Sequence, residues 1–302
     1  MSSQPAPAPE LATIVIGYRA PAEIVGAVRS LREQSVATDI LVVNSGGGDI
    51  GALLRRHGLD VAFVEFEERL YVGAARNRGI ERTRAPYVAF LADDCRAAPG
   101  WVERRLARHK AGAPVVASAV INSKPQNLVA CAAHLSLFMR RLPGLPEEQA
   151  IRYGASFERG LFARHGLYDE TMATGEDSEF LLRLPAELKP AWDGDIRTVH
   201  LNETRILRLL IDQYQRGTNY GREMHRLSGK SLRKIARDVL RQHRPARQLA
   251  MAGLSGGELI QTLRAMPILR LSLLAKAAGV LMAADSRDKS IIAPLSRHGL
   301  RP

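Results

Sequence analysis

The chain has 302 residues, of which 46% are apolar and 25% are charged. These values are ordinary for globular proteins, so they exclude fibrous and disordered classes and allow one large domain with an appendage. The net charge is +12, and residues 201–302 hold 19 basic and seven acidic residues, whereas residues 1–200 are balanced. A basic C-terminal third predicts contact with a polyanion, either nucleic acid or an anionic lipid surface.

The two cysteines, Cys95 and Cys131, exclude a disulfide framework and a four-cysteine zinc site. This usage fits a reducing cytoplasm. Residues 1–10 are rich in Pro and Ala and lack the basic start and apolar run of a signal peptide. We therefore expect residues 1–10 to form a flexible tail.

Short apolar runs alternate with helical patterns over the first 120 residues. The predicted strands are 12–17, 40–43, 61–64, 87–91 and 114–120, and the predicted helices are 22–34, 49–57, 72–82 and 101–110. Continuous apolar runs of this length are typical of strands buried on both faces. Their alternation with helices predicts an α/β fold with a doubly wound, mostly parallel sheet, which binds ligands at the carboxyl ends of its strands.

Later in the chain the pattern is more irregular. Residues 150–200 favour loops with a helix at 177–184, and residues 207–227 predict a long helix. A basic stretch follows at 230–247, and residues 258–284 are strongly apolar, with Pro267 marking a helix start or a kink.

Two acidic pairs are candidate functional groups. Asp93 and Asp94 follow the predicted strand 87–91 directly, where carboxylates suit Mg²⁺ or Mn²⁺ and the metal would neutralise a phosphate leaving group. An isolated pair of this kind is also common in a solvated turn or a helix cap. Glu176 and Asp177 precede an apolar helical pattern, which is compatible with a helix cap and with a general base held ionised at a helix N-terminus.

Five segments in order carry a more specific signal: TIVIGYRAP, DILVVNSGGGD, VGAARNRGI, YVAFLADDC and YGASFERGLFARHGLYDETMATGEDSEFLLRL. Together they resemble the inverting family-two glycosyltransferases with the Rossmann-like GT-A fold. The resemblance covers residues 12–217. It implies a catalytic domain at 11–217, followed by a helical C-terminal region at 218–302.

The resemblance also implies the residues that bind a nucleotide sugar, with UDP as the expected nucleotide. They are Gly17, Tyr18, Arg19, Asn44, Arg76, Asn77, Asp93, Gly154, Ala155 and Arg216. Asn44 stands where relatives usually have Asp. Asn keeps an acceptor oxygen but lacks the charge, so this position does not indicate which nucleobase the donor carries. Arg76 would clamp a phosphate or stack on the base.

For the chemistry, the resemblance implies Asp94 as a ligand of Mn²⁺ or Mg²⁺, with His200 as a further metal ligand or a histidine of ordinary structural role. Asp177 would be the base that deprotonates the acceptor hydroxyl, with Glu176 positioning the acceptor or the base. Gly217 replaces the Trp that processive relatives carry after Gln-x-x-Arg, which favours transfer of a single sugar. The central spatial hypothesis is that residues 93–94 and 176–177 face one cavity.

The C-terminal region allows two interpretations. Residues 268–284 are too short and too interrupted by Arg270 and Lys276 to favour a membrane span. Peripheral contact with the inner face of the cytoplasmic membrane would suit a glycan or lipid-linked acceptor. The alternative is a helical pair that packs on the catalytic domain or forms a homo-oligomer contact.

Two other functional classes remain as alternatives. A nucleotidyltransferase on a similar sheet would release pyrophosphate, and the Gly-Glu-Asp segment at 175–177 argues against it. A non-catalytic nucleic-acid-binding protein would need aromatic stacking platforms. Aromatic residues make up only 5% of the chain, so we expect no nucleic-acid partner.

Overall fold

The computed structural model describes residues 8–150 and 156–283. Their contacts divide into two compact units. Within the described residues, the sheet unit contains residues 8–119, 156–172 and 176–199. The helical unit contains residues 120–150, 173–175 and 200–283. The long helix after residue 205 belongs to the helical unit. The domain ranges 11–217 and 218–302 stay a prediction.

Eight strands form one sheet in the order β3-β2-β1-β4-β7-β6-β8-β5. Their bounds are β1 Leu11–Tyr18, β2 Asp39–Ser45, β3 Ala62–Phe66, β4 Tyr87–Ala92, β5 Cys95–Ala97, β6 Val115–Asn122, β7 Ser156–Glu158 and β8 Ala191–His200. The pairs β1–β2, β1–β4 and β2–β3 are parallel, whereas β7 is antiparallel to both β4 and β6. The mostly parallel sheet is confirmed for its first half, and its second half is mixed.

The sheet register aligns the strand ends that carry candidate residues. Gly17 on β1 pairs with Asn44 on β2, and Ile16 pairs with Ala92 at the end of β4. Because these strands are parallel, their carboxyl ends meet at the same edge of the sheet. The residues that follow Gly17, Asn44 and Ala92 therefore begin at this edge.

Helices cover both faces of the sheet, as a doubly wound fold requires. The helices of the sheet unit are α1 Ile24–Arg32, α2 Ile50–Arg56, α3 Val72–Arg82, α4 Trp101–Lys110, α6 Gly160–His165, α7 Glu176–Arg183 and the 3₁₀ helix η1 Ala186–Leu188. One core cluster joins α1, α2 and α4 to one face, with Leu11 and Val15 from β1. A second cluster joins α3, α6 and α7 to the other face, with Ile14 from β1. The alternation along β1 follows from the two-residue period of strand side chains.

Two sequence-based expectations for the sheet need correction. The run at 61–64 predicts a strand buried on both faces, but β3 lies at one edge of the sheet, and Phe63 is 45% exposed. The pattern over 185–200 favours loops with a short β-like run before His200, whereas Ala191–His200 is a ten-residue strand. Its alternation of polar and apolar residues, from Trp192 to Thr198, fits a strand with one buried side, a pattern weaker than a continuous apolar run.

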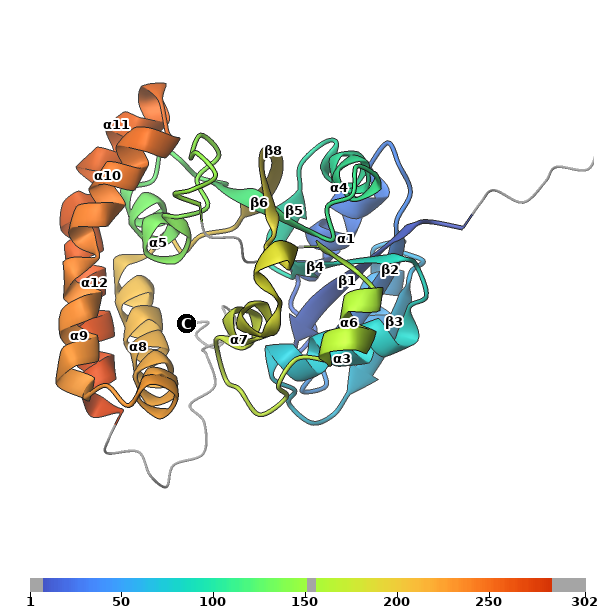
Figure 1. Cartoon of the computed structure of the whole chain (residues 1–302), viewed down its shortest axis with the longest axis horizontal. Helices are drawn as coiled ribbons and strands as arrows, with labels where there is room; N and C mark the ends of the chain where they lie inside the picture. Colours follow the sequence, from blue (N-terminus) through green and yellow to red (C-terminus); the bar gives the residue numbers. More distant parts are fainter. Residues whose placement is uncertain (1–7, 151–155, 284–302) are drawn as a thin grey trace, which may run out of the picture. The chain divides into compact units, whose positions relative to one another are not determined.

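The helical unit consists of helices that enclose their own apolar core. Its helices are α5 Leu128–Phe138, α8 Ile206–Ser228, α9 Leu232–Arg241, α10 His243–Gly253, α11 Gly256–Arg264 and α12 Met266–Met282. The core includes Leu135 of α5, Leu209 of α8, Val239 of α9, Leu249 of α10 and Leu273 of α12. Figure 1 shows α8, α9 and α12 running alongside one another, in orange and red.

Local sequence signals explain several helix ends in this unit. Asn127 caps α5 by accepting a hydrogen bond from Ala130 N, and Ser231 caps α9 by accepting one from Lys234 N. Pro267 lies in the first turn of α12, so it marks a helix start. The long helix predicted at 207–227 is confirmed as α8.

In the described residues, no single helix is both long and apolar enough to cross a membrane. By length and composition alone, α11 and α12 together meet the criterion as a pair bent by 53°.

Candidate functional site

The turn after β1 has an unusual backbone. Arg19 and Ala20 adopt positive φ angles of 59° and 45°. Residues other than glycine rarely occupy this region, at a cost of about 1–3 kcal/mol each, and such strain is common at ligand-binding sites. Hydrogen bonds from Arg19 N to Ser45 O (2.8 Å) and from Ala20 N to Asn44 Oδ1 (2.9 Å) maintain the turn.

Asn44 is fully buried and links three segments. Its Nδ2 donates to Gly47 O at 2.8 Å and to Glu65 Oε1 at 2.6 Å, in addition to the bond that Oδ1 accepts from Ala20 N. The amide thus ties the β1 turn to the glycine loop after β2. The contact of Asn44 with the nucleotide stays a prediction. An ionised Asp, the usual residue in relatives, could not donate the two hydrogen bonds that Nδ2 makes here.

Two guanidinium groups lie close to the Tyr18 ring. The guanidinium carbons of Arg19 and Arg69 lie 5.2 and 5.4 Å from its ring centroid. Gly17 precedes it on β1, where a Cβ would lie 2.8 Å from Ile24 Cδ1. The three predicted residues 17–19 therefore form the tightly packed end of β1 and a cationic, aromatic surface beside it.

Arg76 connects α3 to the start of α7. Its Nη1 donates to Glu176 Oε1 at 2.9 Å, and the side chains are 13% and 8% exposed. The guanidinium also lies 5.2 Å from the Phe90 ring and 5.1 Å from the Tyr168 ring. Burial alone would lower the pKa of Arg76, but Glu176, Tyr168 and Asp177 outweigh burial and raise it. Arg76 is thus a permanent buried cation whose carboxylate partner adjoins the predicted base.

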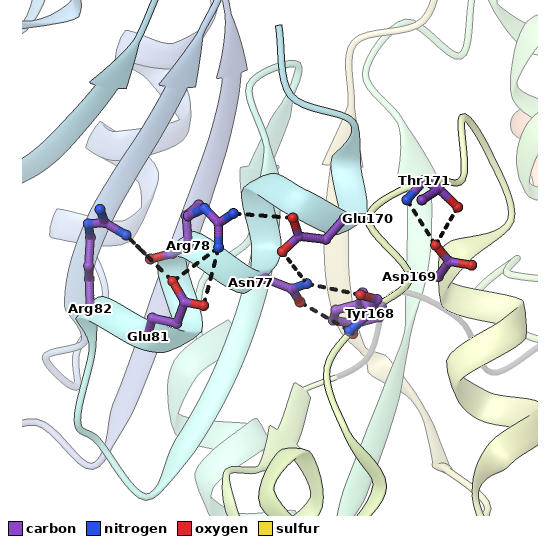
Figure 2. A network of polar contacts seen from close by, with 8 residues as sticks. All are labelled: Asn77, Arg78, Glu81, Arg82, Tyr168, Asp169, Glu170 and Thr171. Atoms are coloured by element: carbon purple, nitrogen blue, oxygen red, sulfur yellow. Dashed lines mark hydrogen bonds and ion pairs between the residues drawn. The ribbon is translucent and has the colours of Figure 1, made fainter. Parts of the chain in front are cut away.

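Asn77 holds the segment before α7 through a two-way amide contact. Its Oδ1 accepts from Tyr168 N at 3.0 Å, and its Nδ2 donates to Tyr168 O at 2.9 Å and to Glu170 Oε1 at 3.0 Å. Figure 2 shows this contact beside the half-buried Arg78 and the exposed Glu81 and Arg82. The nucleotide contact predicted for Asn77 stays a prediction, while the structure gives this side chain a clear role in holding residues 168–170.

The half-buried carboxylates of Asp93 and Asp94 follow β4 immediately. Asp93 N donates to Ile16 O at 3.1 Å, which continues the β1–β4 pairing by one residue. The Asp93 carboxylate accepts from Asp94 N at 2.9 Å, and Asp94 Oδ1 accepts from the Cys95 thiol at 3.6 Å. Asp93 therefore helps to shape the turn that presents Asp94. The roles of Asp93 in nucleotide-sugar binding and of Asp94 in metal binding stay predictions.

Glu176 and Asp177 form the first turn of α7. Asp177 Oδ1 accepts from Ser178 N at 2.7 Å and from Ser178 Oγ at 3.4 Å. Both acidic pairs lie in the sheet unit, and the hypothesis that they face one cavity stays a prediction.

His200 ends β8 and belongs to the helical unit, where it joins a buried polar cluster. Its Nδ1 lies 2.8 Å from Asn202 Oδ1, and the Phe138 ring lies edge-on, 4.7 Å from the imidazole centroid. Asn202 Nδ2 in turn donates to Asn122 Oδ1 at 2.9 Å. Sequence reasoning did not find Asn122 and Asn202, because an isolated Asn carries no motif.

Arg216 is exposed on α8 and pairs with Asp212 at 2.7 Å. Because it lies in the helical unit, its predicted contact with the nucleotide stays a prediction. Gly154 and Ala155, predicted to line the donor site, lie outside the described residues. A further residue that sequence reasoning missed is Tyr168, a buried ring packed against Arg76. Its only sequence signal is its place in HGLYDE, within the fifth resembling segment.

The parallel half-sheet, the antiparallel β7 after it and the acidic turn after β4 define the class: a GT-A nucleotide-sugar transferase. A profile described as glycosyl transferase family 2 matches residues 13–163. The chain belongs to this family and is therefore a glycosyltransferase.

Among solved structures, the mannosyltransferase PcManGT from Pyrobaculum calidifontis, in complex with GDP-Man and Mn²⁺, superposes with a TM-score of 0.59 at 18% identity, covering 95% of this chain and 90% of that one. The crystal structure of S. aureus TarS 1–349 gives a TM-score of 0.49 at 11% identity, covering 89% and 90%. No curated protein sequence matches this chain. At these identities the first likeness supports the fold.

Proposed function

We propose that this protein is an inverting glycosyltransferase that moves one sugar from a nucleoside diphosphate sugar to an acceptor hydroxyl. Asp177 takes the hydroxyl proton as the acceptor oxygen forms its bond to the anomeric carbon. The bond from that carbon to the phosphate oxygen breaks on the opposite face, and the nucleoside diphosphate leaves with the electron pair. One displacement inverts the configuration.

The observation that carries this proposal is the ion pair between Arg76 and Glu176 beside Asp177. The pair fixes the first turn of α7, so the Asp177 carboxylate occupies a defined place rather than a mobile loop. A base must lie within hydrogen-bonding reach of the proton that it removes, and this requires such rigidity.

For the donor, we propose a nucleoside diphosphate sugar, with UDP-sugars as the first candidates from sequence. GDP-mannose is a second candidate, because it is the ligand of the similarly folded mannosyltransferase. The guanidinium groups of Arg19 and Arg69 lie near the Tyr18 ring, at the carboxyl edge of the parallel strands. These positive charges support a diphosphate donor.

For the metal, we propose Mn²⁺ or Mg²⁺ held by Asp94 and His200. A carboxylate after β4 and an imidazole at the end of β8 are a donor set that fits a divalent cation, and the imidazole favours Mn²⁺ of the two. The bound metal would neutralise charge on the departing diphosphate. The complex of the mannosyltransferase with Mn²⁺ is consistent with this choice.

For the location, we propose that the helical unit binds the inner face of the cytoplasmic membrane, where a lipid-linked or glycan acceptor is presented. The α12 stripe consists of Pro267, Leu271, Leu274, Ala278 and Leu281, which are exposed and share one side of the helix. Lys276 is not on this side, because it packs over the Tyr220 ring at 5.0 Å. Burial is the main reason that its pKa is lowered to about 8.

Charge on the neighbouring helices supports an anionic lipid surface. Helix α9 packs against α12, and with α10 it exposes Arg233, Lys234, Arg237, Arg241, Arg244 and Arg247, against the single exposed acid Asp238. Each basic residue near an anionic leaflet contributes about 1 kcal/mol. A second copy of this chain is the competing occupant of the stripe.

The catalytic assignment is tested with Asp177→Asn. We expect the purified variant to lose at least about 10²-fold in transfer rate while retaining donor binding, since a positioned base contributes about 10²–10⁴-fold. Donor binding is followed by the rise in melting temperature with UDP- or GDP-sugars and Mn²⁺. Glu187→Gln, which neutralises an exposed acid on η1, is the matched control.

If Asp177→Asn transfers sugar at the wild-type rate, Asp177 is not the catalytic base. Release of pyrophosphate rather than a free nucleoside diphosphate would instead indicate a nucleotidyltransferase.

The membrane proposal is tested by sedimentation with vesicles. Wild-type protein should bind phosphatidylglycerol vesicles more tightly than phosphatidylcholine vesicles and dissociate as salt is raised. The double variant Leu271→Glu/Leu274→Glu should lose this binding, whereas Phe63→Glu, at an exposed apolar residue of β3, should retain it. Unchanged vesicle binding by the double variant, or a change only from dimer to monomer, contradicts the proposal.

A further inference from the structure

Two buried asparagines, Asn122 and Asn202, connect His200 to the backbone of Lys124 through a chain of hydrogen bonds. The donor and acceptor of each bond in this chain can be assigned. Asn122 Oδ1 accepts from Lys124 N at 3.1 Å, and Asn122 Nδ2 donates to Lys124 O at 3.3 Å. A backbone N–H only donates and a backbone carbonyl only accepts, so these two contacts identify which end of the Asn122 amide is oxygen.

The next step in the chain is Asn202. Its Nδ2 donates to Asn122 Oδ1 at 2.9 Å. The carbonyl of Asn202 must then face the other way, toward His200, where Oδ1 lies 2.8 Å from Nδ1. Because an amide oxygen can only accept, Nδ1 of His200 carries the proton.

The backbone and a neighbouring ring hold the imidazole in this place. His200 O accepts from Ser123 N and from Asn202 N, both at 3.1 Å, which joins the end of β8 to the same turn that orients Asn122. Phe138 packs edge-on against the imidazole. His134, also in the cluster, is buried, and burial is the main reason that its pKa is lowered to about 3.

We infer that Asn202, oriented by Asn122, is a positioning residue that holds a proton on Nδ1 of His200 and so presents Nε2 as the metal-binding nitrogen. A histidine ligand commonly donates its other ring N–H to an acceptor that sets the ring orientation. Here that acceptor is a neutral amide, and its direction is set by the backbone at Lys124. This inference rests on the proposed metal dependence, but the tautomer exists without metal.

The first test is a measurement of the His200 tautomer in metal-free, ¹⁵N-histidine-labelled full-length protein. Long-range ¹H–¹⁵N spectra should show a protonated, pyrrole-type Nδ1 and a pyridine-type Nε2 for His200, assigned by the signal that disappears in His200→Gln. An Nε2–H tautomer in the wild-type protein overturns the inference, whatever the protein's activity.

The second test compares Asn202→Leu with Asn127→Ala. Asn202→Leu removes the acceptor, so the Nδ1–H preference should be lost and Mn²⁺ affinity, measured by the electron paramagnetic resonance signal of free Mn²⁺, should fall about 10–100-fold. Asn127→Ala removes the N-cap of α5 in the same unit and should leave the tautomer and the affinity unchanged.

The outcomes separate this inference from the proposed function. If Asn202→Leu retains both the tautomer and wild-type Mn²⁺ affinity, Asn202 is not a positioning residue. If wild-type protein shows the Nδ1–H tautomer but binds no Mn²⁺, the proposed metal dependence fails, and with it the role of Asn202 toward a metal, while the hydrogen-bond direction stands.

Discussion

At the scale of single residues, Arg76 has the most consequential environment. It is a largely buried cation that pairs with Glu176 and lies close to the rings of both Phe90 and Tyr168. Breaking a buried ion pair by removing one partner leaves an uncompensated charge, which costs more than the pair itself contributes. The side chain that the sequence assigns to phosphate therefore also holds α3 and α7 together.

Arg76→Met should lower the free energy of unfolding by about 3–5 kcal/mol, because the Glu176 carboxylate stays buried without its cation. Urea denaturation followed by circular dichroism measures this change. The double variant Arg76→Met/Glu176→Gln should recover much of the loss. Equal stabilities for the single and double variants would show that the ion pair is not what makes Arg76 important.

At the scale of elements, α8 and α12 pack so closely that glycines are required. A Cβ on Gly279 would lie 2.0 Å from Tyr214 O, and one on Gly217 would lie 2.0 Å from Lys276 O. The obstructing atoms are backbone, so neither helix can yield by rotating a side chain. This contact requires a glycine at 217, the position at which processive relatives carry Trp.

Gly279→Ala should destabilise the protein by at least about 1–3 kcal/mol, the usual cost of overpacking. Gly257→Ala on α11 is the matched control, because a Cβ there meets nothing within 4 Å. The control should be neutral or slightly stabilising, since Ala favours helix over Gly by about 1 kcal/mol. Similar melting temperatures for the two variants would contradict the close packing of α8 on α12.

At the scale of the whole molecule, buried titratable groups in both units shape the dependence of stability on pH. In the sheet unit, burial is the main reason that the pKa of His109 is lowered to about 4. In the helical unit, burial lowers the pKa of His134 to about 3 and that of Lys276 to about 8. In each case the folded protein disfavours the charged form relative to the unfolded chain.

Stability should therefore fall as the pH drops below 6.5, because unfolded histidines bind protons before the buried ones do. The expected slope is about 1.4 kcal/mol per pH unit for each histidine, down to pH 4 for His109. Lys276 affects stability at alkaline pH instead. Burial of its charged form lowers the free energy of unfolding below pH 8, and this loss is recovered as the pH rises from 8 to 10.5.

Urea denaturation at pH 6.5 and pH 5 measures the histidine effect. The variant His109→Gln, which keeps polar groups near Ala113 O and Ser156 Oγ, should show a shallower decline than wild type. A decline of equal slope in both proteins would assign the acid sensitivity to other groups.

Several elements were predictable because their signals are local. The apolar runs of β1 and β4 and the long amphipathic α8 were confirmed with small shifts in their ends. The position of Asp93 and Asp94 after β4 followed from the same local reading. Strands β5 and β7 have only three residues each, too few to show a periodicity, and α5 is apolar all round, so none was found in advance.

The sequence by itself determined the α/β class, the family resemblance and the acidic residues that end a strand or begin a helix, because these depend on spacing along the chain. Only the tertiary structure decided which residues become partners. Arg76 forms an ion pair with Glu176, Asn77 forms hydrogen bonds with the backbone of Tyr168, and Asn202 forms a hydrogen bond with His200. Glu176 is 100 positions from Arg76 and Tyr168 is 91 from Asn77. Such partners are chosen by packing and by the need to satisfy buried polar groups, which no local pattern records.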